Sequence, residues 1–271
     1  MKLHGIDFPD AVRRIVAMDF PPVDAEEMAY RKAEQARREE HKYRLSLNTA
    51  RWRWASSKPA KRTCVEVYLR EVRGLFRKKP LPEVLRYLPA DPFDAKWRGR
   101  HPFPAMIAPF SFMPPGQPPD WEDIAGVHLT FLRSSGYGKA PLDNPKITLG
   151  RRSEYPIVLR HPGSRDHPGR ALIIAEGIET AAAYWHRPAG IWASGTANRL
   201  PAMGDFIPRC RPFIDKVYIA VDDDDAGREY SAELAEYIEE LWHTRYNRET
   251  GFAERVPSEL PAILIGPGVA S

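Results

Sequence analysis

Four short apolar runs in the second half of this 271-residue chain restrict its fold more than any other feature. They lie at residues 171–175, 191–193, 217–221 and 262–265. Helical patterns separate them, most clearly at 226–243, where the apolar residues fall on one face. Strands that alternate with helices form βαβ units, whose strands run parallel. We therefore predict an α/β domain with a central, mostly parallel four-stranded sheet flanked by helices.

The first half of the chain is basic. Residues 31–79 hold 16 Lys and Arg against 5 Asp and Glu, although the net charge of the whole chain is only +4. This asymmetry favours one surface for a polyanion and another for cations. Three segments are expected: a helical segment with a charged linker helix at 1–48, a basic, helix-rich α+β domain at 49–164, and the α/β domain at 165–271.

Several classes of protein are excluded by composition. No apolar run approaches the roughly 18 residues that span a bilayer, and the amino terminus lacks the apolar stretch of a secretory signal. We therefore expect a cytoplasmic protein without a membrane partner. The only two cysteines, Cys64 and Cys210, exclude a disulfide framework and a four-cysteine zinc ribbon within this chain.

Carboxylates follow two of the predicted strands. Glu176 comes directly after the run at 171–175, and Asp222 to Asp225 come directly after the run at 217–221. The carboxyl ends of parallel strands meet at one edge of a sheet, so Glu176, Asp222 and Asp224 are expected there. Oxygen ligands without His or Cys suit Mg²⁺ or Mn²⁺. The alternative is that the aspartates only cap the helix at 226–243.

These motifs resemble the Toprim domain of bacterial-type primases, topoisomerases and some nucleases. Glu176-Gly177 is similar to its glutamate motif, and Asp222-x-Asp224 with Ala226-Gly227-Arg228 to its Asp-x-Asp motif. Residues 194–197, Ser-Gly-Thr-Ala, resemble the turn after the second strand of primases. The phrase Ile-Ala-Glu-Gly-Ile-Glu-Thr-Ala at 174–181 is similar to the primase-like branch of phages, plasmids and other mobile elements.

The resemblance continues upstream of residue 165. Residues 68–75, Tyr-Leu-Arg-Glu-Val-Arg-Gly-Leu, resemble the signature that opens the catalytic core of this branch, and 126–150 resemble its segment before the Toprim domain. Residues 3–8 resemble the tail of a primase zinc-binding domain, whose metal ligands are absent. The chain departs from the pattern at Thr180, where primases often have Asp, and at 266–268, which lack the usual acidic residues.

This resemblance implies a primase-like nucleotidyltransferase that synthesises short RNA primers on single-stranded DNA. Glu176, Asp222 and Asp224 would be the catalytic and metal-binding residues, with Mg²⁺ or Mn²⁺ as cofactor and no zinc. The implied phosphate-binding residues are Lys139, Lys146, Gly177 and Arg228. The basic residues expected to hold nucleic acid are Arg51, Arg53, Lys61, Arg62, Arg70 and Arg73. The implied partners are single-stranded DNA or RNA, nucleoside triphosphates, and a replicative helicase or separate zinc-binding protein.

Other interpretations remain open. The same acidic site would serve a metal-dependent nuclease, and a non-catalytic nucleic-acid-binding subunit of a replication complex would keep the fold without the chemistry. Gly136 to Lys139 resembles part of a phosphate-binding loop but also fits a plain turn. Trp52 and Trp54 could stack on bases or pack a helix. His128, within a predicted strand, is interpreted as structural.

Overall fold

The chain divides into two compact units, Met1–Arg44 and Leu45–Ser271. The computed structural model describes residues 12–13, 25–91, 102–112, 115–117, 120–150, 155–163, 169–246, 253–255 and 262–265. For 242–246, 253–255 and 262–265 only the backbone is described. The interpretations of residues 3–8 and 266–268 lie outside these ranges.

Helix α2, Ala25–Ala55, begins in the first unit and ends in the second, and so runs through the expected boundary at residue 48. Its first part is polar and carries ion pairs between residues four apart, including Arg31 with Glu27 and Arg44 with Glu40. Such exposed pairs stabilise a helix by a few tenths of a kcal/mol each, about 0.3–0.5. This part of α2 is therefore a solvated helix, in keeping with the charged linker helix expected there.

A five-stranded antiparallel sheet dominates the first part of the second unit, in the order β1-β2-β3-β4-β5. Its strands are β1 (Lys58–Pro59), β2 (Arg86–Leu88), β3 (Ala105–Phe110), β4 (Gly126–Phe131) and β5 (Lys146–Gly150). The expectation of a helix-rich domain is wrong here. Between Ala55 and β2 the only helical segment is α3 (Cys64–Val67) with its π-helical continuation η1 (Tyr68–Val72). Pro80 and Pro82, which lack a backbone N–H, follow it, and the chain then pairs as β2 with β3.

The second sheet has the strand order β12-β9-β7-β8-β6. Its strands are β6 (Ile157–Arg160), β7 (Ala171–Ala175), β8 (Gly190–Ala193), β9 (Lys216–Ala220) and β12 (Ala262–Ile265). The four strands read from the apolar runs are parallel, whereas β6 pairs antiparallel with β8 at the edge. The α/β class is confirmed, and the sheet has one strand more than expected, contributed by residues before 165.

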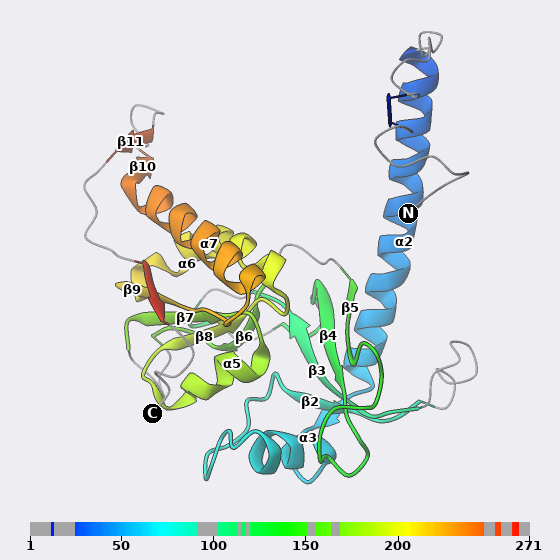
Figure 1. The fold of residues 1–271 in the computed structure, drawn as a ribbon, viewed down its shortest axis with the longest axis vertical. Helices are drawn as coiled ribbons and strands as arrows, with labels where there is room; N and C mark the ends of the chain where they lie inside the picture. Colours follow the sequence, from blue (N-terminus) through cyan, green and yellow to red (C-terminus); the bar gives the residue numbers. More distant parts are fainter. Residues whose placement is uncertain are drawn as a thin grey trace. The chain divides into compact units, whose positions relative to one another are not determined.

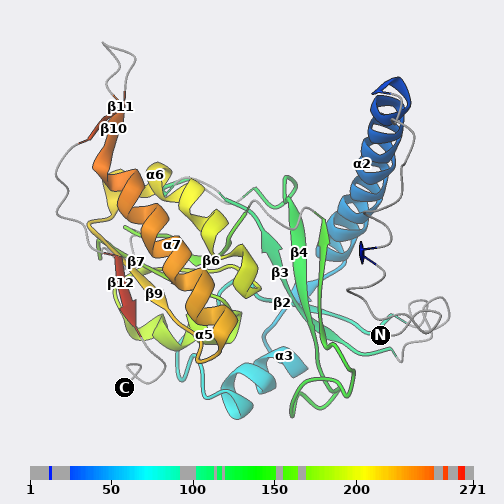
Figure 2. The same cartoon turned by 45° about the horizontal axis from the view of Figure 1, so that its top comes forward.

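Helices cover both faces of the second sheet (Figure 1). On β7, Ile173 joins the apolar cluster that contains α5 (Ile178–Ala183), whereas Leu172 joins the cluster that contains α7 (Asp225–His243). Alternate residues of a strand point to opposite faces, so this continuous apolar run is buried on both sides. Figure 2 shows α7 and α5 on either side of the strands from a second direction.

The two sheets share one core. Met106 and Ala108 of β3 belong to the same buried cluster as Ile173 of β7 and Ile191 of β8. The opposite face of the first sheet packs against the end of α2 through Trp54, which is 3% exposed. Trp54 is therefore a packing residue, whereas Trp52 is 57% exposed. The shared core places residues of the first sheet beside the edge of the second.

The remaining elements are short. They are η2 (Tyr184–His186), η3 (Ala197–Arg199), η4 (Pro201–Phe206), α6 (Ile207–Cys210), η5 (Arg211–Phe213), and the hairpin of β10 (Thr244–Tyr246) with β11 (Ala253–Arg255). Within the described residues, no helix has the length and apolarity that crossing a membrane requires.

Candidate functional site: an acidic edge of the second sheet

Two strands of the second sheet end in carboxylates. Glu176 follows the last residue of β7, and Asp222 lies two residues beyond the end of β9, its neighbour in the sheet. The turn after β8 closes on the same edge, because the N–H of Gly195 donates to the carbonyl of Glu176 over 2.8 Å. Gly195 has φ +88°, which favours glycine, and a Cβ there would lie 3.3 Å from Phe110. The edge predicted from the sequence is therefore formed by the chain.

The surroundings of Glu176 disfavour the charged form of its carboxylate. Burial raises its pKa above the usual value, and the negative charges of Asp222 and Asp224 raise it further. The positive charge of Lys146 and a hydrogen bond from the N–H of Ala197 oppose this effect without cancelling it. A carboxylate in this state is suited to bind a cation or accept a proton.

Asp224 is a helix cap. Its Oδ1 accepts a hydrogen bond from the N–H of Gly227 over 2.6 Å, the contact expected of the residue before a helix. Gly227 is required there, because a Cβ would lie 2.7 Å from the carbonyl oxygen of Asp222. The capping interpretation thus holds for Asp224. Asp222 is not part of the cap and accepts instead from the Oγ1 of Thr180 over 3.3 Å.

Arg228 faces the neighbouring aspartates. It donates to Asp223 over 2.9 Å and to Asp225 over 2.7 Å. All three side chains are largely exposed. The structure therefore places Arg228 at the acidic edge, where its charge is shared by two carboxylates on either side of the helix start.

Glu179, in the first turn of α5, is a charged residue that the sequence motifs did not single out and that contacts several polar neighbours. Its Oε1 accepts from the hydroxyl of Tyr68 over 2.8 Å, and Tyr68 in turn accepts from the Nε of Arg73 over 2.9 Å. Burial raises the pKa of Glu179, but the charge of Lys146, the Tyr68 hydrogen bond and the charge of Lys139 outweigh it. The pKa therefore lies below its usual value.

The two predicted phosphate-binding lysines lie beside these glutamates. The Nζ of Lys139 is 3.7 Å from the Oε1 of Glu179, and this pair is largely shielded from solvent. Lys146 begins β5, and its charge acts on Glu176, Glu179 and the buried His128. Burial, together with the nearby positive charge of Lys146, lowers the pKa of His128 to about 4, so this histidine is neutral at pH 7. It fits the structural interpretation.

A turn that contains Gly136 precedes Lys139. Gly136 donates its N–H to the carbonyl of Arg133 over 2.8 Å and has φ +80°. A Cβ on Gly136 would lie 2.6 Å from the carbonyl oxygen of Cys64, so the turn packs closely on α3. The segment from Gly136 to Lys139 is therefore a plain turn, which nevertheless carries Lys139 to Glu179.

The predicted nucleic-acid-binding residues do not share one surface. Arg53 is only 4% exposed, which is a correction to its expected place on the surface: the end of α2 packs on the first sheet and takes Arg53 with it. Arg51 pairs with Asp123 over 2.9 Å, and Arg73 belongs to the Tyr68 contact. Lys61, Arg62 and Arg70 lie together around α3.

The donor chemistry of the acidic edge suits a hard divalent cation. Glu176, Asp222 and Asp224 offer only carboxylate oxygens, and two of them raise the pKa of the third, which a cation between them would reverse. Within the described residues, however, no three His, Cys, Asp or Glu side chains are gathered closely enough to enclose a metal ion. Mg²⁺ commonly takes one or two carboxylates and completes its shell with substrate phosphates and water.

Comparison with known families and with curated proteins gives two results. The family described as "Domain of unknown function (DUF7146)" matches residues 45–159. None of the curated proteins matches the chain.

Among the solved structures that the chain resembles are DNA primase structures from bacteria and a phage. The DnaG catalytic core is 14% identical with a TM-score of 0.46, covering 83% of this chain and 72% of that one. A DNA primase domain from Pseudomonas aeruginosa is 14% identical with a TM-score of 0.45, covering 83% and 71%. The primase fragment of the bacteriophage T7 primase-helicase protein is 12% identical with a TM-score of 0.37, covering 57% of this chain. The chain spans about half of that fragment, 54%.

Proposed function

We propose that the chain is a Toprim-type, primase-like nucleotidyltransferase that joins ribonucleotides into short primers on single-stranded DNA. The observation that carries the proposal is Glu176, at the carboxyl end of β7, whose pKa is raised by burial and by Asp222 and Asp224. Functional groups of open parallel sheets gather at this edge. Neighbouring carboxylates repel one another when they are all ionised, and a divalent cation bound between them relieves this repulsion.

Glu176 and Asp222 would hold Mg²⁺ or Mn²⁺. Asp224 caps α7 with Oδ1, so its Oδ2 is the atom available to the ion. When bound, the ion stabilises negative charge that develops on the transferred phosphoryl group. The alternative role of Glu176 is that of the base for the attacking 3′-hydroxyl. The ion would then be held by Asp222 and Asp224, and the raised pKa of Glu176 would bring its proton affinity closer to what such a transfer needs.

The cations beside the edge supply the phosphate contacts. Lys139, oriented by Glu179, and Lys146, at the start of β5, would neutralise the triphosphate. Gly177 has space above its Cα, since a Cβ there would come no nearer than 3.4 Å to Thr180, and its backbone can therefore approach a phosphate. Arg228 can contact a phosphate by exchanging Asp223 or Asp225 for it.

The partners proposed for the protein follow from this chemistry. A single-stranded DNA or RNA template and nucleoside triphosphates are the substrates. A replicative helicase or a separate zinc-binding protein would supply the template selection that these residues do not provide. Lys61, Arg62 and Arg70 would hold the template through its phosphates.

The test is a synthesis assay with single-stranded DNA, labelled ribonucleotides and Mg²⁺ or Mn²⁺. Wild type should yield short labelled oligomers. Asp222→Asn and Glu176→Gln should each reduce the yield by about 100-fold or more, because stabilisation by a metal ion is commonly worth several kcal/mol. The matched control is Glu233→Gln, which changes an exposed carboxylate about two turns beyond the start of α7 and should leave the yield unchanged.

The other outcomes identify the alternatives. Shortening of the DNA, lost with the same two substitutions, would indicate a nuclease. Binding of DNA with neither synthesis nor cleavage, also after addition of a helicase or zinc-binding protein, would indicate an accessory subunit. Synthesis that survives both substitutions would refute the proposed site.

A further inference from the structure

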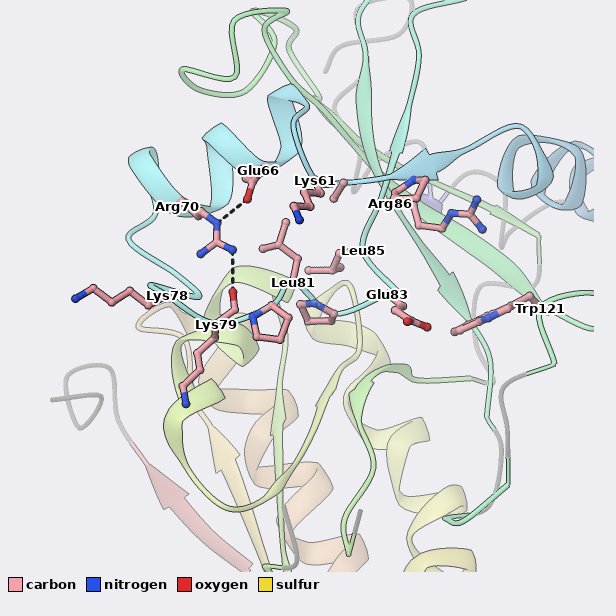
Figure 3. A pocket seen from close by; sticks show the side chains of 14 residues that line it. Lys61, Glu66, Arg70, Lys78, Lys79, Leu81, Glu83, Leu85, Arg86 and Trp121 are labelled. Carbon is pink, nitrogen blue, oxygen red and sulfur yellow. Dashed lines mark hydrogen bonds and ion pairs between the residues drawn. The ribbon is translucent and has the colours of Figure 1, made fainter. Parts of the chain in front are cut away.

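A cavity lies beside the first sheet and is lined by none of the carboxylates of the acidic edge. It has a volume of about 850 Å³, within the range of small-molecule sites. Its lining comes from the segment around β1, from α3–η1, from residues 78–86 and from Trp121 (Figure 3). The cavity has an apolar floor that includes Leu81 and Leu85.

One ion pair organises the wall of this cavity. Glu66 accepts from the backbone N–H of Arg62 over 2.7 Å and from the Nε of Arg70 over 2.9 Å. Arg70 also donates to the carbonyl of Lys79 over 2.8 Å and to that of Phe76. Glu66 and Arg70 therefore neutralise each other while fixing both the segment before α3 and the loop after η1.

These same two segments have unusual backbone. Arg62, Phe76 and Lys78 have φ values of 62°, 53° and 57°, and they are the only non-glycine residues with positive φ in the part of the chain that the structure describes. Side chains disfavour this conformation, which persists where the surroundings enforce it and is concentrated at binding sites. Here the hydrogen bonds of Glu66 and Arg70 hold the backbone in this conformation. They thereby fix the positions of the neighbouring residues Lys61, Lys78 and Lys79.

Three lysines of the lining remain available to an anion. Lys61, Lys78 and Lys79 are exposed and form no ion pair with any described residue. Figure 3 shows Lys78 and Lys79 at one end of the cavity and Trp121 at the other, with Leu81 between them. From the end with Lys78 and Lys79 to the other, the cavity thus offers cationic groups, an apolar floor, the carboxylate of Glu83 and an aromatic wall.

We propose that this cavity binds nucleotide units, with phosphate groups at Lys61, Lys78 and Lys79 and a base against Trp121. Lysines bind phosphates as point charges, and aromatic side chains stack on bases of any sequence. The size and elongated layout favour a stretch of single strand, and a free nucleotide presents the same chemistry. The inference rests on the proposed function, for which the strand would be the template.

The cavity is connected to the acidic edge by one helical segment. Glu66 and Arg70 lie on the cavity side of α3–η1, whereas Tyr68 of the same segment contacts Glu179. A strand held by the cavity therefore lies on the element that also orients Glu179 and, through it, Lys139. The cavity and the residues around Glu179 are therefore joined through α3–η1, although no residue belongs to both.

The test measures fluorescence anisotropy of labelled dT12 with the full chain, in EDTA and over a range of salt. The triple variant Lys61→Gln, Lys78→Gln, Lys79→Gln should weaken binding about 100-fold at 0.1 M salt and reduce the salt slope by about 2, at roughly 0.7 per phosphate. The matched control is Lys32→Gln, Lys42→Gln, Lys216→Gln, which removes equal charge from exposed lysines elsewhere and should change affinity less than about threefold.

A second pair of variants tests the aromatic wall. Trp121→Leu should weaken binding roughly tenfold with an unchanged salt slope, whereas Tyr30→Leu, which changes an exposed aromatic side chain of α2, should have no effect. Addition of ATP separates the two sources of the ligand. If ATP displaces dT12 and this displacement depends on the three lysines, the cavity is a free-nucleotide site. If ATP does not displace dT12, the cavity is a site for a strand.

The proposal is overturned if the pocket variant binds dT12 as wild type does, or if both triple variants lose affinity equally. Because binding is measured without metal ions, the outcome is independent of catalysis. Unchanged binding by the pocket variant, with synthesis still dependent on Asp222, would remove the cavity and leave the proposed function standing. Loss of binding by the pocket variant, in a protein whose wild type synthesises nothing, would support the cavity and remove the proposed function.

Discussion

At the scale of single residues, two glutamates three positions apart experience opposite electrostatic surroundings. The pKa of Glu176 is raised by burial and by Asp222 and Asp224, whereas the pKa of Glu179 is lowered because Lys146, Tyr68 and Lys139 outweigh its burial. Groups whose pKa values are driven apart by their environment are suited to different tasks. Glu176 is suited to cation and proton chemistry, and Glu179 to orienting its cationic neighbours.

Glu179→Gln should lower the free energy of unfolding by about 2 kcal/mol at pH 7, because a buried carboxylate loses charge-assisted contacts with Tyr68 and Lys139. A carboxyl whose folded pKa is depressed contributes stability above its unfolded pKa of about 4.3 and loses it as pH falls through the lower folded value. The difference between wild type and variant should therefore narrow below about pH 4.3.

Urea unfolding at a series of pH values measures this difference. The exposed Glu233→Gln is the control, and its difference from wild type should stay small and constant. A Glu179→Gln difference that widens towards low pH would contradict the assigned role of Glu179.

At the scale of elements, the start of α7 combines a structural and a chemical demand on one residue. Asp224 caps the helix through Gly227, and the same carboxylate lies among the candidate metal ligands. Capping requires an oxygen at this position, whereas binding a cation favours the charge as well. Substitutions that keep or remove the oxygen can therefore separate the two demands.

Asp224→Ala should lower the free energy of unfolding by about 1 kcal/mol, because the N–H of Gly227 loses its partner. Asp224→Asn should keep nearly all of this stability, since Asn caps helices as well as Asp does. Both variants should reduce Mg²⁺-dependent synthesis. Chemical denaturation of the two proteins side by side measures the effect. Equal destabilisation of the Ala and Asn variants would contradict the capping role, because Asn keeps the capping oxygen.

At the scale of the whole molecule, the chain comprises two units of different character. The described part of the first unit is a solvated helix with surface ion pairs, whereas the second unit contains both sheets and their shared core. Ala50 and Trp54, near the end of α2, belong to the second unit and are buried against the first sheet. The stability of the second unit should therefore depend on the end of α2 and not on its beginning.

Deletion of residues 1–44 should leave the midpoint of thermal unfolding nearly unchanged, because it removes none of the buried residues of the second unit. Deletion of residues 1–55 also removes Ala50 and Trp54 and should destabilise the protein by at least the roughly 3–5 kcal/mol that loss of a buried Trp costs. Calorimetry of both truncated chains measures this contrast. A large loss already in the shorter deletion would contradict the division into two units.

Sequence by itself determined the parallel strands of the second sheet and the residues at their ends. The apolar runs at 171–175 and 262–265 coincide with β7 and β12, and the helix expected at 226–243 is α7 within one residue. These features are local: strand length, apolar continuity and the residues that follow each strand lie within a few positions of one another. The same local reading placed Glu176, Asp222 and Asp224 on one edge.

Only the tertiary structure decided the features that join distant parts of the chain. The antiparallel sheet pairs β2, which ends at Leu88, with β3, which begins at Ala105. The burial of Arg53 follows from how the end of α2 packs on that sheet. Tyr68 and Glu179 are 111 positions apart, so their hydrogen bond has no local signal. Pairing, burial and pKa depend on which groups the folded chain brings together, and the pattern of neighbouring residues does not contain that information.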